Sequence, residues 1–155
     1  MLKRKIDHYI KRYYETTRNA LLITGARQIG KTYSIRQFGK SFKSFVEINF
    51  IDNPEAVDVF KGAKGSADIL FRLSAMTTIP LIKGETLIFF DEVQKCPEMV
   101  TAIKFLVDEG SYRYILSGII AWCRAEGFAF GTCGIYGNQR YVSPRFRGVY
   151  FVCGH

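Results

Sequence analysis

The sequence predicts an α/β fold, in which helices cover both faces of a parallel β-sheet, and three observations lead to this prediction. A short apolar run, Ala20–Thr24, is suited to a buried strand and leads directly into a glycine-containing loop. A second apolar run, Thr86–Phe90, ends in two adjacent carboxylates. Segments with apolar residues at helical spacing lie between the predicted strands, which is the order expected when helices join parallel strands.

Composition and charge narrow the class of protein without choosing a function. The chain has 155 residues, of which 48% are hydrophobic, enough for one domain with a buried core. No apolar run reaches the roughly 20 residues of a membrane span and no signal-peptide core is present, so we expect a cytoplasmic protein. The net charge of +8 would suit nucleic acid, an anionic surface or nucleotide phosphates. The four cysteines show no paired spacing, so we expect no zinc site.

Residues 1–18 predict an amphipathic, basic helix. One face has residues at helical spacing, namely Leu2, Ile6, Tyr9, Ile10, Tyr13 and Thr17. Lysines and arginines occupy the rest of its surface. Such a helix either packs beside the domain with its charged face in water, or uses that face to contact nucleic acid or a protein partner.

Residues 25–32 fit a phosphate-binding loop, which has two glycines with four residues between them, followed by Lys and Ser or Thr. Gly25 and Gly30 would let backbone N–H groups approach phosphate oxygens. Lys31 would contact the last two phosphates and Thr32 would offer its hydroxyl to Mg²⁺, while the helix that follows adds the positive end of its dipole. The loop consists of Gly25, Ala26, Arg27, Gln28, Ile29, Gly30, Lys31 and Thr32.

The next elements continue the alternation of helix and strand. Tyr33–Phe38 extends the loop as a helix, and Ser44–Phe50 alternates apolar and polar residues as a strand does. Asn53, followed by Pro54, predicts the start of another helix. Ser66 is expected to cap the helix after it, whose apolar face we place in the core: Ile69, Leu70, Leu73 and Met76.

Asp91 and Glu92 are the second candidate site, because an apolar strand rarely ends in two carboxylates. In a parallel sheet, ligands gather at the carboxyl ends of the strands, so this pair would lie beside Lys31 and Thr32. Asp91 would hold the metal, and Glu92 would activate the water that attacks the terminal phosphate. Alternatively, the pair is a helix cap or a surface pair at a strand end.

Two further elements complete the recognisable part. Pro97 is expected to open a helix that ends near Gly110, and Tyr112–Ser117 predicts a fourth strand. Ser117 would end this strand at the same edge as the loop. It would sense the terminal phosphate or orient water, or it simply ends the strand as a polar residue.

Together these residues resemble the AAA-type P-loop ATPases of bacteria and archaea in which an ATPase domain precedes a C-terminal domain of unknown function. The resemblance covers residues 2–118. It depends on three stretches: Ile23–Thr32, Phe89–Gln94 and Tyr114–Gly118. It implies that the loop binds ATP and Mg²⁺, that Asp91 coordinates the metal, and that Glu92 is the catalytic carboxylate, with Lys31 and Ser117 (the sensor position) assisting.

The first functional hypothesis is therefore Mg²⁺-dependent ATP binding, and possibly hydrolysis, by residues 1–118. A second hypothesis is a basic DNA-binding or protein-docking module with a vestigial nucleotide site. A kinase is a third, because the same loop serves phosphoryl transfer to an acceptor, although Glu92 beside Asp91 favours water. Assembly into an oligomer is compatible with the resemblance but not required by the sequence.

Residues 119–155 differ in composition from the rest of the chain. They contain no Leu, Lys, Asp or Met, but hold three of the four cysteines and the sole tryptophan. We interpret this segment as translated out of frame, with a divergent natural terminus as the alternative. The sheet would then be incomplete, lacking a fifth strand beside the first, and the family's arginine finger and second sensor would be missing. An ordered strand from this segment at the sheet edge would contradict the interpretation.

Overall fold

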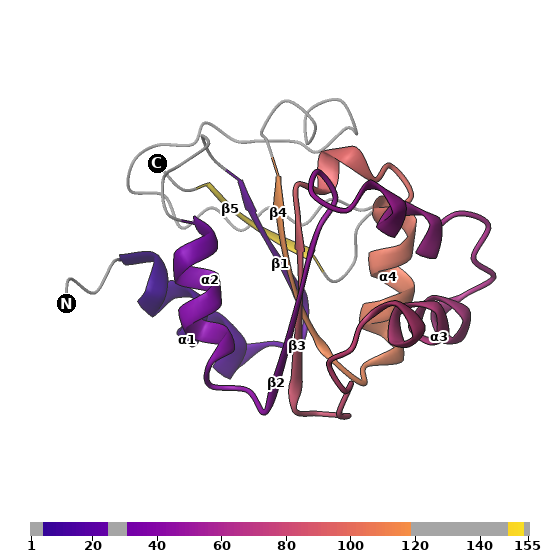
Figure 1. Ribbon diagram of the computed structural model, residues 1–155. Helices are drawn as coiled ribbons and strands as arrows, with labels where there is room; N and C mark the ends of the chain where they lie inside the picture. Colours follow the sequence, from indigo (N-terminus) through magenta and orange to yellow (C-terminus); the bar gives the residue numbers. More distant parts are fainter. Residues whose placement is uncertain (1–4, 25–30, 119–148, 154–155) are drawn as a thin grey trace.

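The computed structural model describes residues 5–24, 31–118 and 149–153, and within them a single parallel sheet carries the fold (Figure 1). The strands are β1 (Ala20–Thr24), β2 (Ser44–Asn49), β3 (Thr86–Asp91), β4 (Arg113–Gly118) and β5 (Val149–Cys153). Their order across the sheet is β2-β3-β4-β1-β5, and every neighbouring pair is parallel. The predicted α/β class is confirmed.

Helices lie on both sides of this sheet. The α-helices are α1 (Lys5–Thr16), α2 (Lys31–Gly39), α3 (Ser66–Met76) and α4 (Met99–Glu109), and the 3₁₀ helices are η1 (Pro54–Val59) and η2 (Val93–Lys95). α1 and α2 cover one face, and α3 and α4 cover the other (Figure 1). The side chains of successive residues in β3 point alternately to the two faces of the sheet. Leu87 and Phe89 join the core beneath α1 and α2, whereas Ile88 and Phe90 join the core beneath α3 and α4.

The basic opening helix packs against the domain, as the first of its two interpretations predicts. Ile10, Tyr13 and Tyr14 are buried, whereas the neighbouring Lys11 and Arg12 are exposed. The Tyr13 hydroxyl donates a hydrogen bond to the carbonyl of Ala20 at 3.2 Å, and the Tyr14 hydroxyl donates to the carbonyl of Tyr114. α1 is therefore bonded to two strands of the sheet.

Arg113, at the start of β4, holds the carboxyl end of α1. Its guanidinium donates hydrogen bonds to the carbonyls of Thr17, at 2.7 Å, and Tyr14, at 2.5 Å, and lies 5.1 Å from the centre of the Tyr14 ring. The last carbonyls of a helix have no partners within the helix, and a cation there also suits the helix dipole. This contact fixes where α1 ends and β1 begins.

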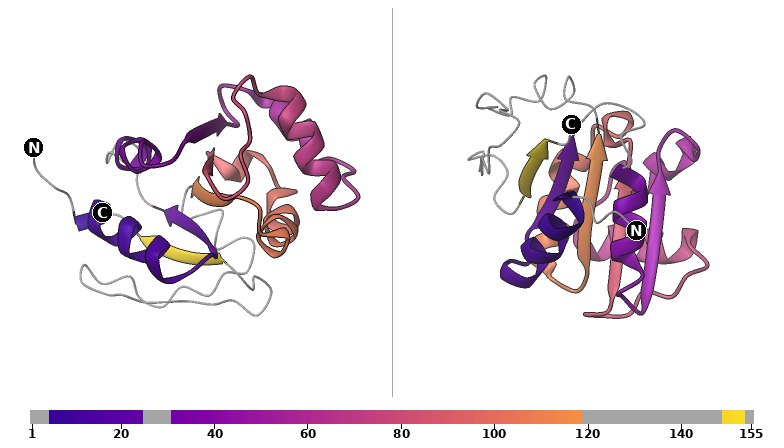
Figure 2. Two further views of the ribbon diagram at one scale, coloured as in Figure 1. Left: turned by 90° about the horizontal axis from the view of Figure 1, so that it is seen from below. Right: turned by 90° about the vertical axis from the view of Figure 1, so that its left-hand side faces the viewer.

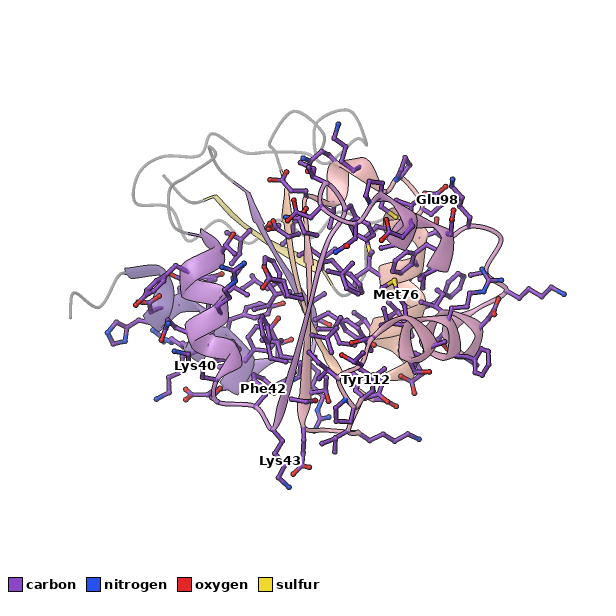
Figure 3. All side chains as sticks on the ribbon, in the orientation of Figure 1. Lys40, Phe42, Lys43, Met76, Glu98 and Tyr112 are labelled. Atoms are coloured by element: carbon purple, nitrogen blue, oxygen red, sulfur yellow. The ribbon has the colours of Figure 1, made fainter. Side chains whose placement is uncertain are left out.

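Three details differ from the sequence-based expectations. Met76, which is labelled in Figure 3, is the last residue of α3, after which Thr77 turns into extended backbone. Its side chain is 40% exposed rather than in the core. Ser66 does not cap α3, since the capping position belongs to Gly65, whose φ of 151° disfavours a side chain. The segment after Asn53 forms a 3₁₀ helix without a side-chain cap.

Residues 119–155 contribute a strand, which corrects the expectation of an incomplete sheet. β5 pairs in parallel with β1 from Ala20 opposite Val149 to Thr24 opposite Cys153 (Figure 2). The fifth strand beside the first is therefore present, and this pairing counts against an out-of-frame origin for the stretch. Residues 119–148, 154 and 155 lie outside the described residues.

Candidate functional site

Polar side chains gather where β2, β3 and β4 end. Asn49 on β2 is opposite Asp91 on β3, and Ser117 on β4 follows the Phe90–Leu116 pair, so the three residues form a row across adjacent strands. They share the face of Leu87 and Phe89, which is the face covered by α1 and α2. β1, the next strand, ends at Thr24 immediately before the predicted phosphate-binding loop. The row therefore leads towards the start of that loop.

The Asp91 carboxylate is the centre of this row. It is 7% exposed, and the Ser117 hydroxyl donates a hydrogen bond to its Oδ1. The backbone N–H of Glu92 also donates to Oδ1, at 3.0 Å, and the Asn49 side-chain amide donates to Oδ2, at 3.2 Å. Three donors from three directions thus fix the orientation of one buried carboxylate.

Asn49 is oriented by the loop that follows it. Its side-chain oxygen accepts hydrogen bonds from the backbone N–H groups of Ile51, at 2.8 Å, and Asp52, at 3.1 Å. Its amide nitrogen is left to face Asp91. The sequence reasoning did not single out Asn49, although the rule that selected Asp91, a polar residue at the end of a parallel strand, applies to it equally.

Burial and neighbouring charge make the ionised form of Asp91 unfavourable. Burial is the largest cause that raises the pKa of its carboxyl above the ordinary range, and the charges of Glu92 and Glu47 raise it further. The hydrogen bonds from Ser117 and from the Glu92 N–H lower the pKa, but they do not offset burial. The edge of the sheet therefore concentrates negative charge in a place that a cation would stabilise.

A guanidinium near the row is already paired. Arg36 on α2 makes two hydrogen bonds to Glu47 on β2, each at 2.8 Å. The bonds to Glu47 are the main cause that raises the pKa of Arg36, and the charge of Asp91 adds to it. This pair holds the middle of α2 against the second strand, and the sequence reasoning did not foresee it.

Glu92 has an unusual backbone conformation. Its φ of 58° and ψ of 46° are left-handed, and it is the one non-glycine residue with positive φ in the described part of the chain. The chain turns there from β3 into η2, and the Gln94 amide donates a hydrogen bond to Glu92 Oε2. Left-handed backbone at a non-glycine residue is costly, and such residues concentrate at functional sites.

The structure describes only part of the predicted phosphate-binding loop. Gly25–Gly30 lie outside the described residues, while α2 begins at Lys31, directly after them. Thr32, in the first turn of α2, is half-buried. The structure thus brings Asp91, Glu92 and Ser117 together at one edge, and it places the start of α2 after the loop as the sequence predicts.

Comparison with known families identifies the fold. A family model for an AAA domain matches residues 17–121, which is more than half of the chain. The chain belongs to the AAA domain family. Membership indicates nucleotide binding and ATPase-type activity. No curated protein matches the chain.

The limits of the match can be compared with the structure of this AAA domain. The matched segment begins after α1 and includes β1 to β4 with the Asn49, Asp91 and Ser117 row. It ends before β5, although β5 is part of the same sheet.

None of the helices in the described part of the chain has the length and apolar composition that a membrane-spanning helix needs.

Proposed function

We propose that the chain binds ATP together with Mg²⁺ at the carboxyl edge of its sheet, through the loop Gly25–Thr32 and Asp91. The observation that carries the proposal is the buried Asp91 carboxylate, which three hydrogen-bond donors hold in place at the edge where β1 leads into the loop. A solvated surface pair at a strand end would not need such fixing.

The residues at this edge suit Mg²⁺. Magnesium takes oxygen ligands and is usually held by one or two carboxylates or hydroxyls together with phosphates, which are the groups that Asp91 and Thr32 provide. Burial and the charges of Glu92 and Glu47 raise the pKa of Asp91. A bound cation would stabilise the ionised carboxylate against both effects. Bound Mg²⁺ would neutralise charge on the phosphates. Lys31 and the loop amides would hold those phosphates.

Glu92 and Ser117 have the hydrolytic roles in this proposal. Glu92 would accept a proton from water, because its carboxylate follows Asp91 directly and is held by Gln94. Ser117 is bonded to Asp91 and would transmit the state of the terminal phosphate to the metal ligand. Hydrolysis by the isolated chain should be slow, since Arg36, the described arginine beside this row, is bound to Glu47.

Titration with a fluorescent ATP analogue tests the binding site. We expect saturable binding that Lys31→Ala abolishes and that loses its Mg²⁺ dependence in Asp91→Asn. Lys40→Ala is the matched control, because Lys40 directly follows the same helix, is exposed, and donates a hydrogen bond to the Gln37 side chain at 3.3 Å. Circular dichroism of each variant establishes that it is folded. Binding that persists in folded Lys31→Ala would remove the loop from the proposal.

A second role concerns the basic face of α1. Lys11 and Arg12 on α1 are exposed, as is Arg18 just after the helix, while the opposite side of α1 is buried, so this basic surface is available to nucleic acid or a protein partner. Under this proposal, Lys31→Ala retains DNA binding and a Lys11→Glu, Arg12→Glu variant loses it. DNA retention by that variant would exclude the helix as the contact surface.

A further proposal concerns the chain beyond residue 118. We propose, from the resemblance alone, that proteins of this kind carry a C-terminal domain after the ATPase domain; the resemblance is compatible with an oligomer but does not require one. The gene sequence around codon 118 tests whether residues 119–155 are in frame. An uninterrupted reading frame that encodes this segment in related genes would exclude the out-of-frame origin.

A further inference from the structure

The side chain of Gln94 folds back onto the carboxylate two residues before it. Its amide nitrogen donates a hydrogen bond to Glu92 Oε2. The left-handed backbone of Glu92 makes this possible, because it turns the chain sharply, and the N–H of Lys95 closes the turn on the Glu92 carbonyl at 3.0 Å. The turn after β3 thus presents a carboxylate and an amide as a bonded pair.

The other end of the Gln94 amide lies against β4. Its Oε1 is buried and has no hydrogen-bond partner among the described residues. A Cβ placed on Gly118 would be 3.2 Å from this oxygen and 3.0 Å from a methyl group of Val93, so a side chain there would push Gln94 and Val93 a few tenths of an ångström from their present positions. Rotating the amide would turn its oxygen towards the Glu92 carboxylate, which is unfavourable, so the orientation is fixed.

We propose that Gln94 is the positioning residue for Glu92, holding its carboxylate in the orientation from which it takes a proton from water. This inference rests on the proposed function of Glu92. Gln94 also lies beside Gly118 at the end of β4, one residue after the Ser117 that donates to Asp91. The side chains that hold the two carboxylates therefore lie close to the same end of β4.

A positioning role predicts a particular kinetic result. Gln94→Leu keeps the volume but removes the donor, and Gln94→Glu keeps the shape but places a second carboxylate beside Glu92. Both should lower the single-turnover rate of ATP hydrolysis, measured with protein in excess, on the order of 10- to 100-fold, since small misplacements of a catalytic group have effects of this size. The dissociation constant for ATP and the midpoint of thermal unfolding should stay near the wild-type values.

Two more variants sharpen the experiment. Gly118→Ala should also lower the rate, because its Cβ displaces Gln94 without removing either of its polar atoms. Gln37→Leu is the matched control: it makes the same chemical change in a half-buried glutamine of α2, whose side chain accepts a hydrogen bond from Lys40. It should hydrolyse ATP at the wild-type rate.

Glu92→Gln separates this inference from the function on which it rests. If Glu92→Gln loses turnover while Gln94→Leu keeps the wild-type rate, Gln94 does not position the carboxylate and the inference is overturned, with the proposed function intact. If Glu92→Gln turns over like wild type, the proposed hydrolytic role of Glu92 is wrong and this inference falls with it, whereas ATP binding is decided separately by Lys31→Ala. Loss of ATP binding or of folding in Gln94→Leu and Gln94→Glu would assign Gln94 a structural role instead.

Discussion

Replacing Ser117 by alanine should destabilise the folded chain through a single hydrogen bond. Ser117 is 2% exposed, and its hydroxyl donates to the Asp91 carboxylate. A hydrogen bond to a charged group contributes about 1.5–3 kcal/mol, and its loss leaves the buried carboxylate with two donors instead of three. Ser117→Ala should therefore lower the free energy of unfolding by about 2 kcal/mol.

Ser34 provides the matched control, because it is a serine of equal burial without such a bond. It lies on α2, is 1% exposed, and its hydroxyl has no hydrogen-bond partner among the described residues. Ser34→Ala removes the same atoms, relieves a buried unsatisfied hydroxyl and favours the helix, so stability should stay the same or rise by about 0.5–1 kcal/mol. The two variants remove the same atoms from equally buried sites, and the main difference between them is whether the hydroxyl has a partner.

Urea denaturation measures the difference. With a slope of about 1–3 kcal/mol per molar urea, the Ser117→Ala midpoint should fall by about 1 M relative to wild type, whereas the Ser34→Ala midpoint should not fall. Equal midpoints for Ser117→Ala and wild type would refute the contact.

The loss of stability in Ser117→Ala should also depend on pH. The Ser117 hydroxyl favours the ionised form of Asp91, and loss of this bond raises the pKa of Asp91 beyond the increase that burial already causes. The deficit of Ser117→Ala should be complete only where Asp91 is ionised in both proteins, which is above the higher pKa of the variant. It should shrink as pH falls through the raised pKa, at higher pH than the value of about 3.9 for an ordinary aspartate. A constant deficit across this range would mean that the lost stability does not come from the carboxylate.

Three other outcomes can be measured. ATP hydrolysis by the chain alone should be slow, because a missing arginine finger costs about 10³ to 10⁵ in rate, and fast turnover that Glu92→Gln abolishes would show that another group supplies it. Arg113→Met should lower the free energy of unfolding by about 2 kcal/mol, since it leaves the carbonyls of Tyr14 and Thr17 without their donor, and urea denaturation checks this. A chain ending at Gly118 should melt at a lower temperature and aggregate more, because β1 becomes an edge strand, and equal melting would mean that β5 adds no stability.

The elements were predictable from the sequence because their signals are local. The apolar run of β3 and the alternation of β2 match their burial in the sheet. The meeting of Asp91 and Ser117 followed from one rule, that parallel strands end at the same edge, and their hydrogen bond agrees with it. The roles assigned to these residues stay predictions, to be decided by the kinetic variants.

The left-handed turn at Glu92 was not predictable, because no sequence signal marks it. Left-handed backbone usually calls for glycine or asparagine, and position 92 has neither. Without that turn, Gln94 has no reason to lie against Glu92 rather than in solvent. The pairing of Arg36 with Glu47 was unpredictable for a different reason: it joins a helix to a strand, and its geometry depends on how α2 packs.

The strand β5 was missed because the composition of the whole segment was given more weight than its local apolar pattern. Val149–Cys153 is an apolar run like that of β3, and the rule used for β1 and β3 would have predicted a strand there. The unusual composition of residues 119–155 led us to expect no strand in this segment. Composition is an average over all of these residues, whereas β5 has only five residues. Pairing depends on backbone groups that every residue except proline supplies, so a short apolar stretch can complete a sheet edge whatever surrounds it. Composition is thus a guide to the origin of a segment, and local pattern is the better guide to whether part of it joins the fold.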